Sequence, residues 1–227
     1  MDAHEKLAHE KLLNSWAQQV NHQGHCFIQD GVIEQRRWDA TTPKVLFLLK
    51  EARHDGPESS WDLREFIREN NGPYGPALKN AAYWSYAIHH IARGNLPGFP
   101  VEKSTLDEAA ELFLSSAVVN IKKSRGTAHS SYDDLAQHGQ TDGALIKKQI
   151  ELIDPDIVIC GYTWPHVKHV WQHEAQAGGY DGVWRVGRRV FIDFWHPAYP
   201  IPDDLKYYAL SCLLQNSRVL SKAALAA

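Results

Sequence analysis

Four short runs of apolar residues recur along the chain, and stretches with helical periodicity separate them. The runs are KVLFLL (44–49), SAVVNI (116–121), DPDIVICG (154–161) and VFIDFW (190–195). Strands that are apolar on both faces are typical of parallel sheets, because helices cover both sides of such sheets. The alternation predicts an α/β protein, a three-layer αβα sandwich with a central, mostly parallel four-stranded sheet.

The chain has 227 residues, which suits one well-packed domain, with two domains as the less favoured alternative. Hydrophobic residues make up 44% and charged residues 22%, which excludes the disordered and fibrous classes. We expect a single αβα domain over 1–227, with an N-terminal helix and a small hairpin (1–40) packed on the core. The segment HCFIQDGVIEQ (25–35) predicts that hairpin, because it alternates around an Asp30-Gly31 turn. The segment 141–153 predicts a helix ahead of the third strand.

The N-terminal segment MDAHEKLAHEKLLNSW reads as a charged amphipathic helix and lacks the apolar region of a signal peptide. No apolar run approaches the ~18 residues that span a bilayer. We therefore expect a cytoplasmic protein with no membrane partner, and a monomer, although the oligomeric state stays open. The net charge of −3 means that any anionic ligand must be met by a local patch of positive charge.

Polar residues follow the apolar runs at similar depths. Glu51, Asn120 and His196 each lie at or just past the end of a run. In parallel sheets ligands bind beyond the carboxyl ends of the strands, so we expect these three side chains to share one pocket. Cationic residues surround them in the sequence: Lys50, Arg53, Lys122, Lys123 and Arg125. A cationic rim favours a phosphate-bearing ligand.

Structural explanations compete with each of these functional ones. Asn120 fits the cap of a strand end, His196 and Pro197 fit a rigid turn, and Glu51 fits an ion pair with Arg53 or Lys50. The charges of residues 121–126 fit a solvated loop. Three scattered cysteines form no CxxC pair, and the histidine pairs His4/His9, His89/His90 and His166/His169 lack the HExxH arrangement. We therefore expect neither a metal nor a cofactor.

Four segments, taken in order, resemble the motifs of the uracil-DNA glycosylase superfamily over roughly residues 44–200. They are VLFLLKEARHDG (45–56), AVVNIKKSRG (117–126), DPDIVICG and FWHPAYP (194–200). Ala198 replaces the serine of the family's His-Pro-Ser motif. The first motif lacks the aspartate with a Pro-Tyr-His tail, and the three cysteines cannot supply the four ligands of the iron–sulfur branches.

The resemblance implies a hydrolase of the DNA glycosylase type. Such an enzyme binds single- or double-stranded DNA, flips a base out of the stack and cleaves its N-glycosidic bond without a cofactor. In this reading Asn120 reads the base edge and His196 donates to the base carbonyl that collects negative charge. Glu51 positions water and offsets the cationic sugar.

The resemblance also implies roles for the flanking residues. The cations Lys50, Arg53, Lys122, Lys123 and Arg125 would hold phosphates. Tyr74, Tyr83 or Trp84 would stack on the flipped base, and Tyr199 would fill the gap left in the duplex. The first motif continues as RHDGPESSW, with no aromatic residue before Trp61 to block groups on C5. Uracil and C5-modified pyrimidines both remain open, with the modified base slightly favoured.

Two other functions remain open. One is a non-catalytic nucleic-acid or nucleotide-binding protein on the same fold, and the other is a small-molecule hydrolase that uses Glu51 and His196. DNA repair and phage defence are both compatible with the resemblance.

Overall fold

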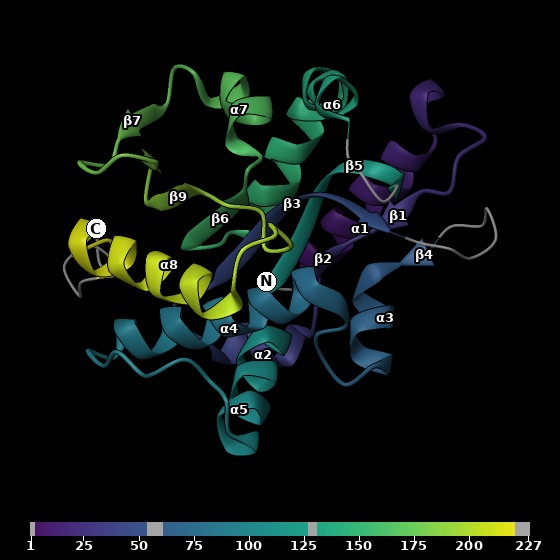
Figure 1. Cartoon of the computed structure of the whole chain (residues 1–227). Coiled ribbons are helices and arrows are strands. Elements are labelled where there is room, and N and C mark those ends of the chain that lie inside the picture. Colours follow the sequence, from purple (N-terminus) through teal and green to yellow (C-terminus); the bar gives the residue numbers. More distant parts are fainter. Residues whose placement is uncertain (1–2, 54–60, 127–130, 221–227) are drawn as a thin grey trace.

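The computed structural model of the chain describes residues 3–53, 61–126 and 131–220. Within these ranges one large mixed sheet has the strand order β2-β5-β3-β6-β9-β8-β7 (Figure 1). A second sheet pairs β1 (Ile28–Gln29) with β4 (Trp61–Asp62) in parallel. The expected α/β class is confirmed.

The four expected strands form the centre of the large sheet. They are β5 (Ala117–Gly126), β3 (Val45–Arg53), β6 (Ile157–Gly161) and β9 (Arg189–Phe194), and each runs parallel to its neighbour. The sheet was predicted to have four strands, and this was wrong, because antiparallel strands extend it at both edges. These are β2 (Gly31–Val32) beside β5, and β8 (Val183–Val186) and β7 (Ala175–Ala177) beyond β9.

The predicted N-terminal hairpin was wrong. Gly31 does turn the chain, with φ of 138°, but β1 and β2 on its two sides do not pair with each other. Instead β1 pairs with β4, and β2 pairs with the amino end of β5. A Cβ at Gly31 would lie 2.7 Å from His9 Cε1, so the glycine also allows close packing on the first helix.

Helices cover both faces of the large sheet. One buried cluster joins the sheet to α3 (Leu63–Glu69), α4 (Gly75–Ala92), α5 (Lys103–Leu114) and α8 (Asp203–Ser217). The other joins the opposite face to α1 (Ala3–Ala17), α2 (Gln35–Ala40), α6 (Tyr132–Ile153), α7 (Trp164–Val167) and the 3₁₀ helix η2 (Lys168–Trp171). In Figure 1, α4, α5 and α8 lie below the sheet and α6 and α7 lie above it. A short 3₁₀ helix, η1 (Val20–His22), follows α1.

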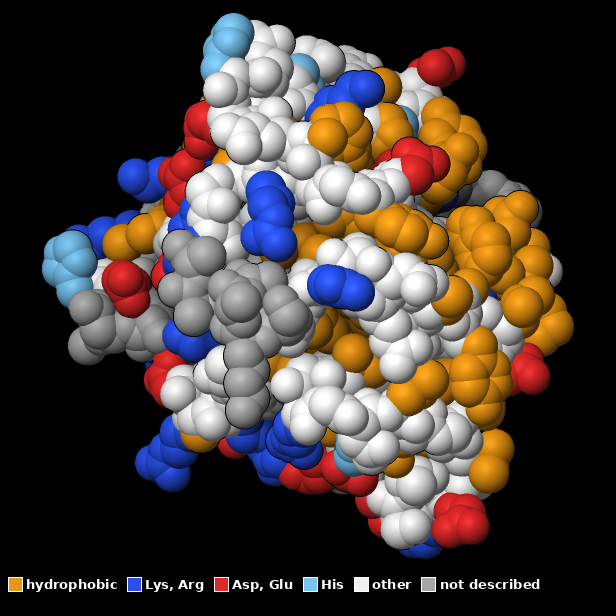
Figure 2. All heavy atoms as spheres, turned by 90° about the vertical axis from the view of Figure 1, so that its left-hand side faces the viewer, with side chains coloured by type: hydrophobic (Ala, Val, Ile, Leu, Met, Phe, Trp, Pro, Cys, Tyr) orange, Lys and Arg blue, Asp and Glu red, His pale blue; other side chains and the backbone are white. Residues whose placement is uncertain are grey.

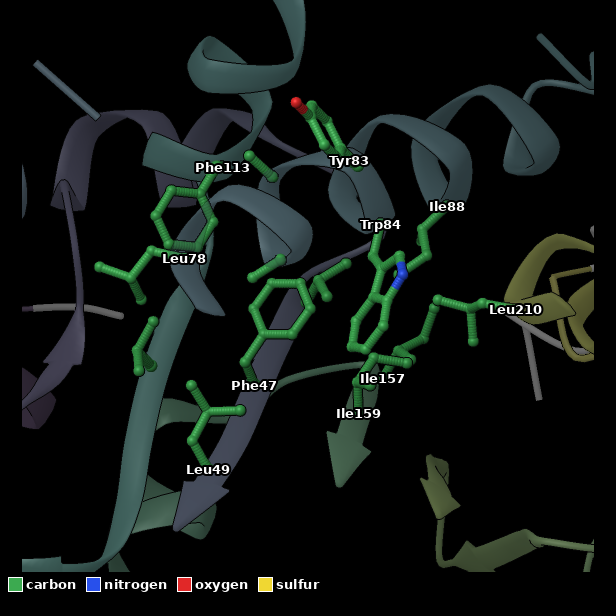
Figure 3. Close-up of a cluster of buried hydrophobic side chains, with 14 of the residues drawn as sticks. Phe47, Leu49, Leu78, Tyr83, Trp84, Ile88, Phe113, Ile157, Ile159 and Leu210 are labelled. Carbon is green, nitrogen blue, oxygen red and sulfur yellow. The ribbon is translucent and has the colours of Figure 1, made fainter. Parts of the chain in front are cut away.

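Side chains of β3 alternate between the two clusters. Phe47 and Leu49 point into the cluster formed with α4 and α5, where Figure 3 shows the ring of Phe47 between Trp84 and Phe113. Leu46 and Leu48 belong to the opposite cluster. Because successive side chains of a strand point to opposite faces, Glu51 continues the row of Phe47 and Leu49 past the end of the core.

In the parts of the chain that the structure describes, no helix combines the length and the apolar character needed to cross a bilayer.

Candidate functional site

A cavity of about 660 Å³ opens at the carboxyl end of the parallel strands. Its volume lies within the ~300–1,000 Å³ of typical small-molecule sites. Glu51, Asn120 and His196 all line it, so the structure brings the three candidate catalytic residues together. The rest of the lining is mostly apolar or aromatic and comes from β3 and from the segments that begin α3 and α4: Leu49, Ala52, Arg53, Trp61, Leu63, Phe66, Tyr74, Gly75, Pro76, Ala77 and Leu78.

Strand register places Glu51 and Asn120 on the same face. Leu49 lies opposite Asn120, and Glu51 lies opposite Lys122. The register then shifts, and Arg53 lies opposite Gly126. Such a bulge commonly re-aims side chains near active sites. A Cβ at Gly126 would lie 2.6 Å from Glu51 Cγ, so this position has no room for a larger residue beside the carboxylate.

His196 lies just beyond β9, and the structure holds it as a neutral imidazole. The backbone N–H of Ala198 donates to His196 Nδ1 over 3.2 Å, which leaves the ring proton on Nε2. Burial, aided by the charges of Lys50 and Lys206, lowers the pKa of His196 to about 4. At neutral pH the side chain can therefore donate one hydrogen bond from Nε2.

Lys206 of α8 fixes the turn that carries His196. Its buried ammonium donates to the carbonyl oxygens of Pro197 (2.8 Å) and Tyr199 (3.2 Å) and lies 2.9 Å from the carboxylate of Asp203. Sequence reasoning missed this residue, because a lysine in the first turns of an amphipathic helix gives no signal of a buried role.

Asp30 fixes the amide of Asn120 from behind the cavity. Its Oδ2 accepts from the backbone N–H of Asn120 over 2.8 Å and from Asn120 Nδ2 over 3.3 Å. An ionised carboxylate only accepts hydrogen bonds, so it selects the orientation in which the amide nitrogen points toward Asp30. The amide oxygen then points away from Asp30, and Asn120 offers the cavity an acceptor.

Lys123 was predicted to contact phosphate, and this was wrong because the side chain is fully buried. Its Nζ lies 2.5 Å from Asp30 Oδ1 and 2.8 Å from Gln149 Oε1, and 4.8 Å from the centre of a Trp16 ring. Burial lowers the pKa of Lys123, while the Asp30 carboxylate opposes that shift. Lys123 therefore supports Asp30, and through Asp30 it supports Asn120.

Lys122 lies between two carboxylates. Its Nζ is 3.2 Å from Glu51 Oε2 and 2.6 Å from Asp134 Oδ2, and its side chain is 14% exposed. These partners raise the pKa of Lys122 against the opposing effect of burial. The ammonium is thus engaged within the protein, and it holds one oxygen of Glu51. Over the described ranges, no donor reaches the other oxygen, Glu51 Oε1, which is buried.

The remaining predicted cations lie apart from one another. Arg53 is exposed and lines the cavity. Arg125 is exposed and lines a smaller cavity of about 270 Å³, together with Lys122 and Asp134. Lys50 points to the opposite face of β3, where its Nζ lies over the rings of Tyr132 and Tyr162.

The aromatic residues predicted to contact the DNA also lie apart from one another. Tyr74 is 64% exposed and lines the cavity, against Phe66. Trp84 was predicted to bind substrate, and this was wrong because its position on α4 places it fully inside the core (Figure 3). Tyr83 is also buried, against Phe99. Tyr199 is half exposed and stacks on Trp195 outside the cavity.

The segment 54–60 lies outside the described residues. It contains most of the segment RHDGPESSW, which carried the prediction about C5 substituents. Trp61, its last residue, lines the cavity.

Taking only the described residues, no three His, Cys, Asp or Glu side chains group closely enough to hold a metal ion. The arrangement at the cavity instead combines a carboxylate, an amide oxygen and a neutral imidazole donor. Such a set can bind a polar ring and stabilise charge that develops on it.

Comparisons with models of known protein families, with curated proteins and with solved structures found no match to this chain.

Proposed function

We propose that this chain is a DNA glycosylase-like hydrolase that cleaves the N-glycosidic bond of a flipped-out uracil or C5-modified pyrimidine in DNA. One observation carries the proposal: Glu51 of β3, Asn120 of β5 and His196 of the turn after β9 line one cavity. They have the chemical types and the order along the chain that the resemblance to the uracil-DNA glycosylase superfamily implies.

The base would bind at the inner end of the cavity. Its polar edge meets Asn120, whose amide Asp30 orients, and its face lies against the aromatic wall that includes Tyr74 and Phe66. An acceptor held in one orientation selects the donor groups of the base edge. To enter such a pocket, the base must flip out of its stacked position in a duplex or in a single strand.

Bond cleavage places negative charge on the departing base and positive charge on the sugar. The Nε2–H of His196 donates to the base carbonyl oxygen that collects the negative charge, and a neutral imidazole does so without a proton transfer. The carboxylate of Glu51 lines the cavity, where it offsets the cationic sugar and positions the attacking water. Water adds to C1′ as the C1′–N bond breaks, and the products are a free base and an abasic site.

The test is a panel of oligonucleotides, each with one altered base, assayed for abasic-site formation. The panel contains uracil, 5-methylcytosine, 5-hydroxymethylcytosine and glucosylated 5-hydroxymethylcytosine. We expect cleavage of at least one pyrimidine. In His196→Ala and Asn120→Ala we expect a rate about 10²–10³-fold lower, since each change removes one preorganised polar group.

The matched control is His173→Ala, which removes an exposed histidine outside the cavity. Full activity in His196→Ala and Asn120→Ala would contradict the assigned roles. Cleavage of purine lesions alone would contradict the pyrimidine assignment. Cleavage of free nucleosides without any need for DNA would favour the small-molecule hydrolase, and binding without any cleavage would favour a non-catalytic protein.

A further inference from the structure

Two half-exposed tyrosines lie at the carboxyl edge of the sheet, on the face opposite the cavity. Tyr132 begins α6 and is 53% exposed, and Tyr162 directly follows β6 and is 48% exposed. Their rings meet edge to face with centroids 6.0 Å apart. The ammonium of Lys50 lies 4.8 Å from the ring centre of Tyr132 and 5.6 Å from that of Tyr162. We call these three residues the tyrosine–lysine cluster.

The tyrosine–lysine cluster lies next to His196. Tyr162 follows Gly161, and a Cβ at Gly161 would lie 3.5 Å from His196 Cδ2. Lys50 is also close enough to help lower the pKa of His196. The turn that carries Tyr162 therefore adjoins His196, one of the residues that line the cavity.

The backbone at Tyr162 is strained. Its φ is 58°, a left-handed conformation that is unfavourable for a residue other than glycine. The backbone N–H of Tyr162 lies 2.8 Å from the carbonyl oxygen of Cys160 and 2.7 Å from that of Phe194, so the sheet holds the strained turn in place. A ring that stays half exposed recovers little of this cost through burial, and strain of this kind concentrates at ligand-binding positions.

A second pair of exposed aromatic residues flanks His196 in the sequence. Trp195 is 36% exposed and Tyr199 is 50% exposed, and their ring planes lie 17° apart with centroids 6.3 Å apart. Aromatic surfaces thus occur both in the turn that carries His196 and beside it. Aromatic side chains at such a rim are suited to stacking with bases.

The charge distribution does not favour a duplex. Proteins that bind duplex DNA commonly neutralise several phosphates with Lys and Arg. Here Lys122 and Lys123 bond carboxylates of the protein, and the chain carries a net charge of −3. On the face drawn in Figure 2, Lys and Arg side chains are scattered among acidic and neutral ones. Stacking on the face of an aromatic ring is open only to unpaired bases, so exposed tyrosine rings favour a single strand over a duplex.

We propose that Tyr132 and Tyr162 form a stacking subsite for an unpaired base beside the flipped nucleotide, so that the substrate is single-stranded DNA. This inference rests on the proposed function, because it takes the cavity as the site of the flipped base. Lys50 holds the two rings in their relative positions through its contacts with both.

The experiment measures binding by fluorescence anisotropy to a labelled oligonucleotide of ordinary bases, as a single strand and as a duplex. The variant Tyr162→Gly removes the ring and relieves the strained φ, so it should keep or raise the melting temperature. We expect it to weaken single-strand binding about 5- to 150-fold, since stacking on one aromatic ring is worth ~1–3 kcal/mol per base. Tyr162→Phe keeps the ring and should bind like the unchanged protein.

The matched control is Tyr180→Ala, which removes a tyrosine that is 42% exposed between β7 and β8. It should leave binding unchanged. Single-strand binding that Tyr162→Gly does not weaken would overturn the subsite, as would a duplex bound as tightly as the single strand.

Abasic-site formation, measured on the same single strand and duplex with one altered base, separates this inference from the proposed function. Equal cleavage of both forms, unaffected by Tyr162→Gly, would overturn the subsite and leave the glycosylase standing. Single-strand binding that depends on Tyr162, with no abasic site formed from any base, would support the subsite and overturn the glycosylase.

Discussion

On the cavity face of β5, Asn120 lines the cavity and Lys122 lies 3.2 Å from the carboxylate of Glu51. On the opposite face, Ile121 and Lys123 are fully buried against α1 and α6. Lys122 and Lys123 are neighbours in the sequence, but strand geometry sends their side chains in opposite directions. A cluster of positive charge in the sequence is therefore not a patch of positive charge on the surface.

Both lysines nevertheless support the candidate site. Lys122 bonds Glu51 directly, and Lys123 bonds Asp30, which in turn orients the amide of Asn120. The two faces differ in what surrounds each ammonium. Lys122 keeps some contact with solvent, whereas Lys123 is fully buried beside Asp30, Gln149 and the Trp16 ring. The same change should therefore affect mainly activity at Lys122 and mainly stability at Lys123.

The largest expected effect is that of Lys123→Met. Removing the ammonium leaves Asp30 as an unpaired buried charge, which typically costs about 3–5 kcal/mol. Urea unfolding measures this loss in the free energy of unfolding. The double variant Lys123→Met, Asp30→Asn should recover part of it, because no charge is then left buried. A loss below about 1 kcal/mol in the single variant would mean that Lys123 has no structural role.

The next largest effect is that of Lys122→Met on catalysis. One hydrogen bond to a charged group contributes about 1.5–3 kcal/mol, so the loss of the ammonium that holds Glu51 should lower kcat about 10- to 100-fold. Lys122→Arg keeps the charge and should restore part of the rate.

Salt dependence distinguishes this role of Lys122 from a phosphate contact. Because the ammonium already bonds two carboxylates, the slope of log affinity against log salt should stay the same in Lys122→Met. A slope that falls by about one unit, with kcat unchanged, would instead return Lys122 to phosphate binding.

The sequence predicted the central parallel strands well and their surroundings poorly. The runs that became β3, β5, β6 and β9 are apolar on both faces, which is a strong signal. The edge strand β2 has only two residues, Gly31 and Val32, so no periodicity reveals it. The Asp30-Gly31 pair looked like a hairpin turn, yet Asp30 is a buried acceptor for Asn120, Lys123 and Gln149.

The start of α6 was also misplaced, and its glycines explain why. The helix was expected from 141, but it begins at Tyr132, with the Ser131 side chain accepting from the backbone N–H of Asp134. Gly139 reads as a helix breaker in the sequence, but a Cβ there would lie 2.3 Å from the carbonyl oxygen of His166. The glycine is present because α6 packs closely on α7, a contact that no local pattern predicts.

For the site, the order of the strand ends along the chain predicted which side chains share the cavity. The sequence did not predict the directions in which the neighbouring side chains point. Strand ends indicated Glu51, Asn120 and His196, because parallel strands place their carboxyl ends together. The supporting residues Asp30, Asp134 and Lys206 come from other elements, so only the tertiary packing brings them to the site.

A smaller effect is expected on the pH dependence of the free energy of unfolding, and it concerns His196 on the cavity face. The folded protein lowers the pKa of His196 from 6.5 to about 4, so between these values the unfolded chain binds a proton that the folded chain does not. The free energy of unfolding should therefore fall as the pH falls through this range. His196→Gln should make this decrease in the free energy of unfolding less steep. Part of the decrease should remain, because buried His89 has a similarly lowered pKa and contributes in the same direction.

Urea unfolding at pH 7, 6, 5 and 4 measures this dependence on pH. The control is His173→Gln, which makes the same substitution at an exposed histidine outside the cavity. If the curves of His196→Gln and the unchanged protein run parallel, the imidazole is not held neutral by the fold.

The smallest expected effect is that of Arg125→Gln, and it completes the comparison of the cations on β5. Arg125 is exposed, in contrast to Lys122 and Lys123, so its charge is the one best placed to meet a phosphate. Neutralising it should lower the slope of log affinity against log salt by up to about one unit and weaken binding alike for all base sequences. The control is Arg36→Gln, which makes the same change of net charge on α2, at another exposed position. Equal slopes for the two variants would show that Arg125 does not contact the DNA backbone. Since Lys122 and Lys123 bond carboxylates of the protein, binding would then depend on the cavity, on Arg53 and on the aromatic side chains at the rim.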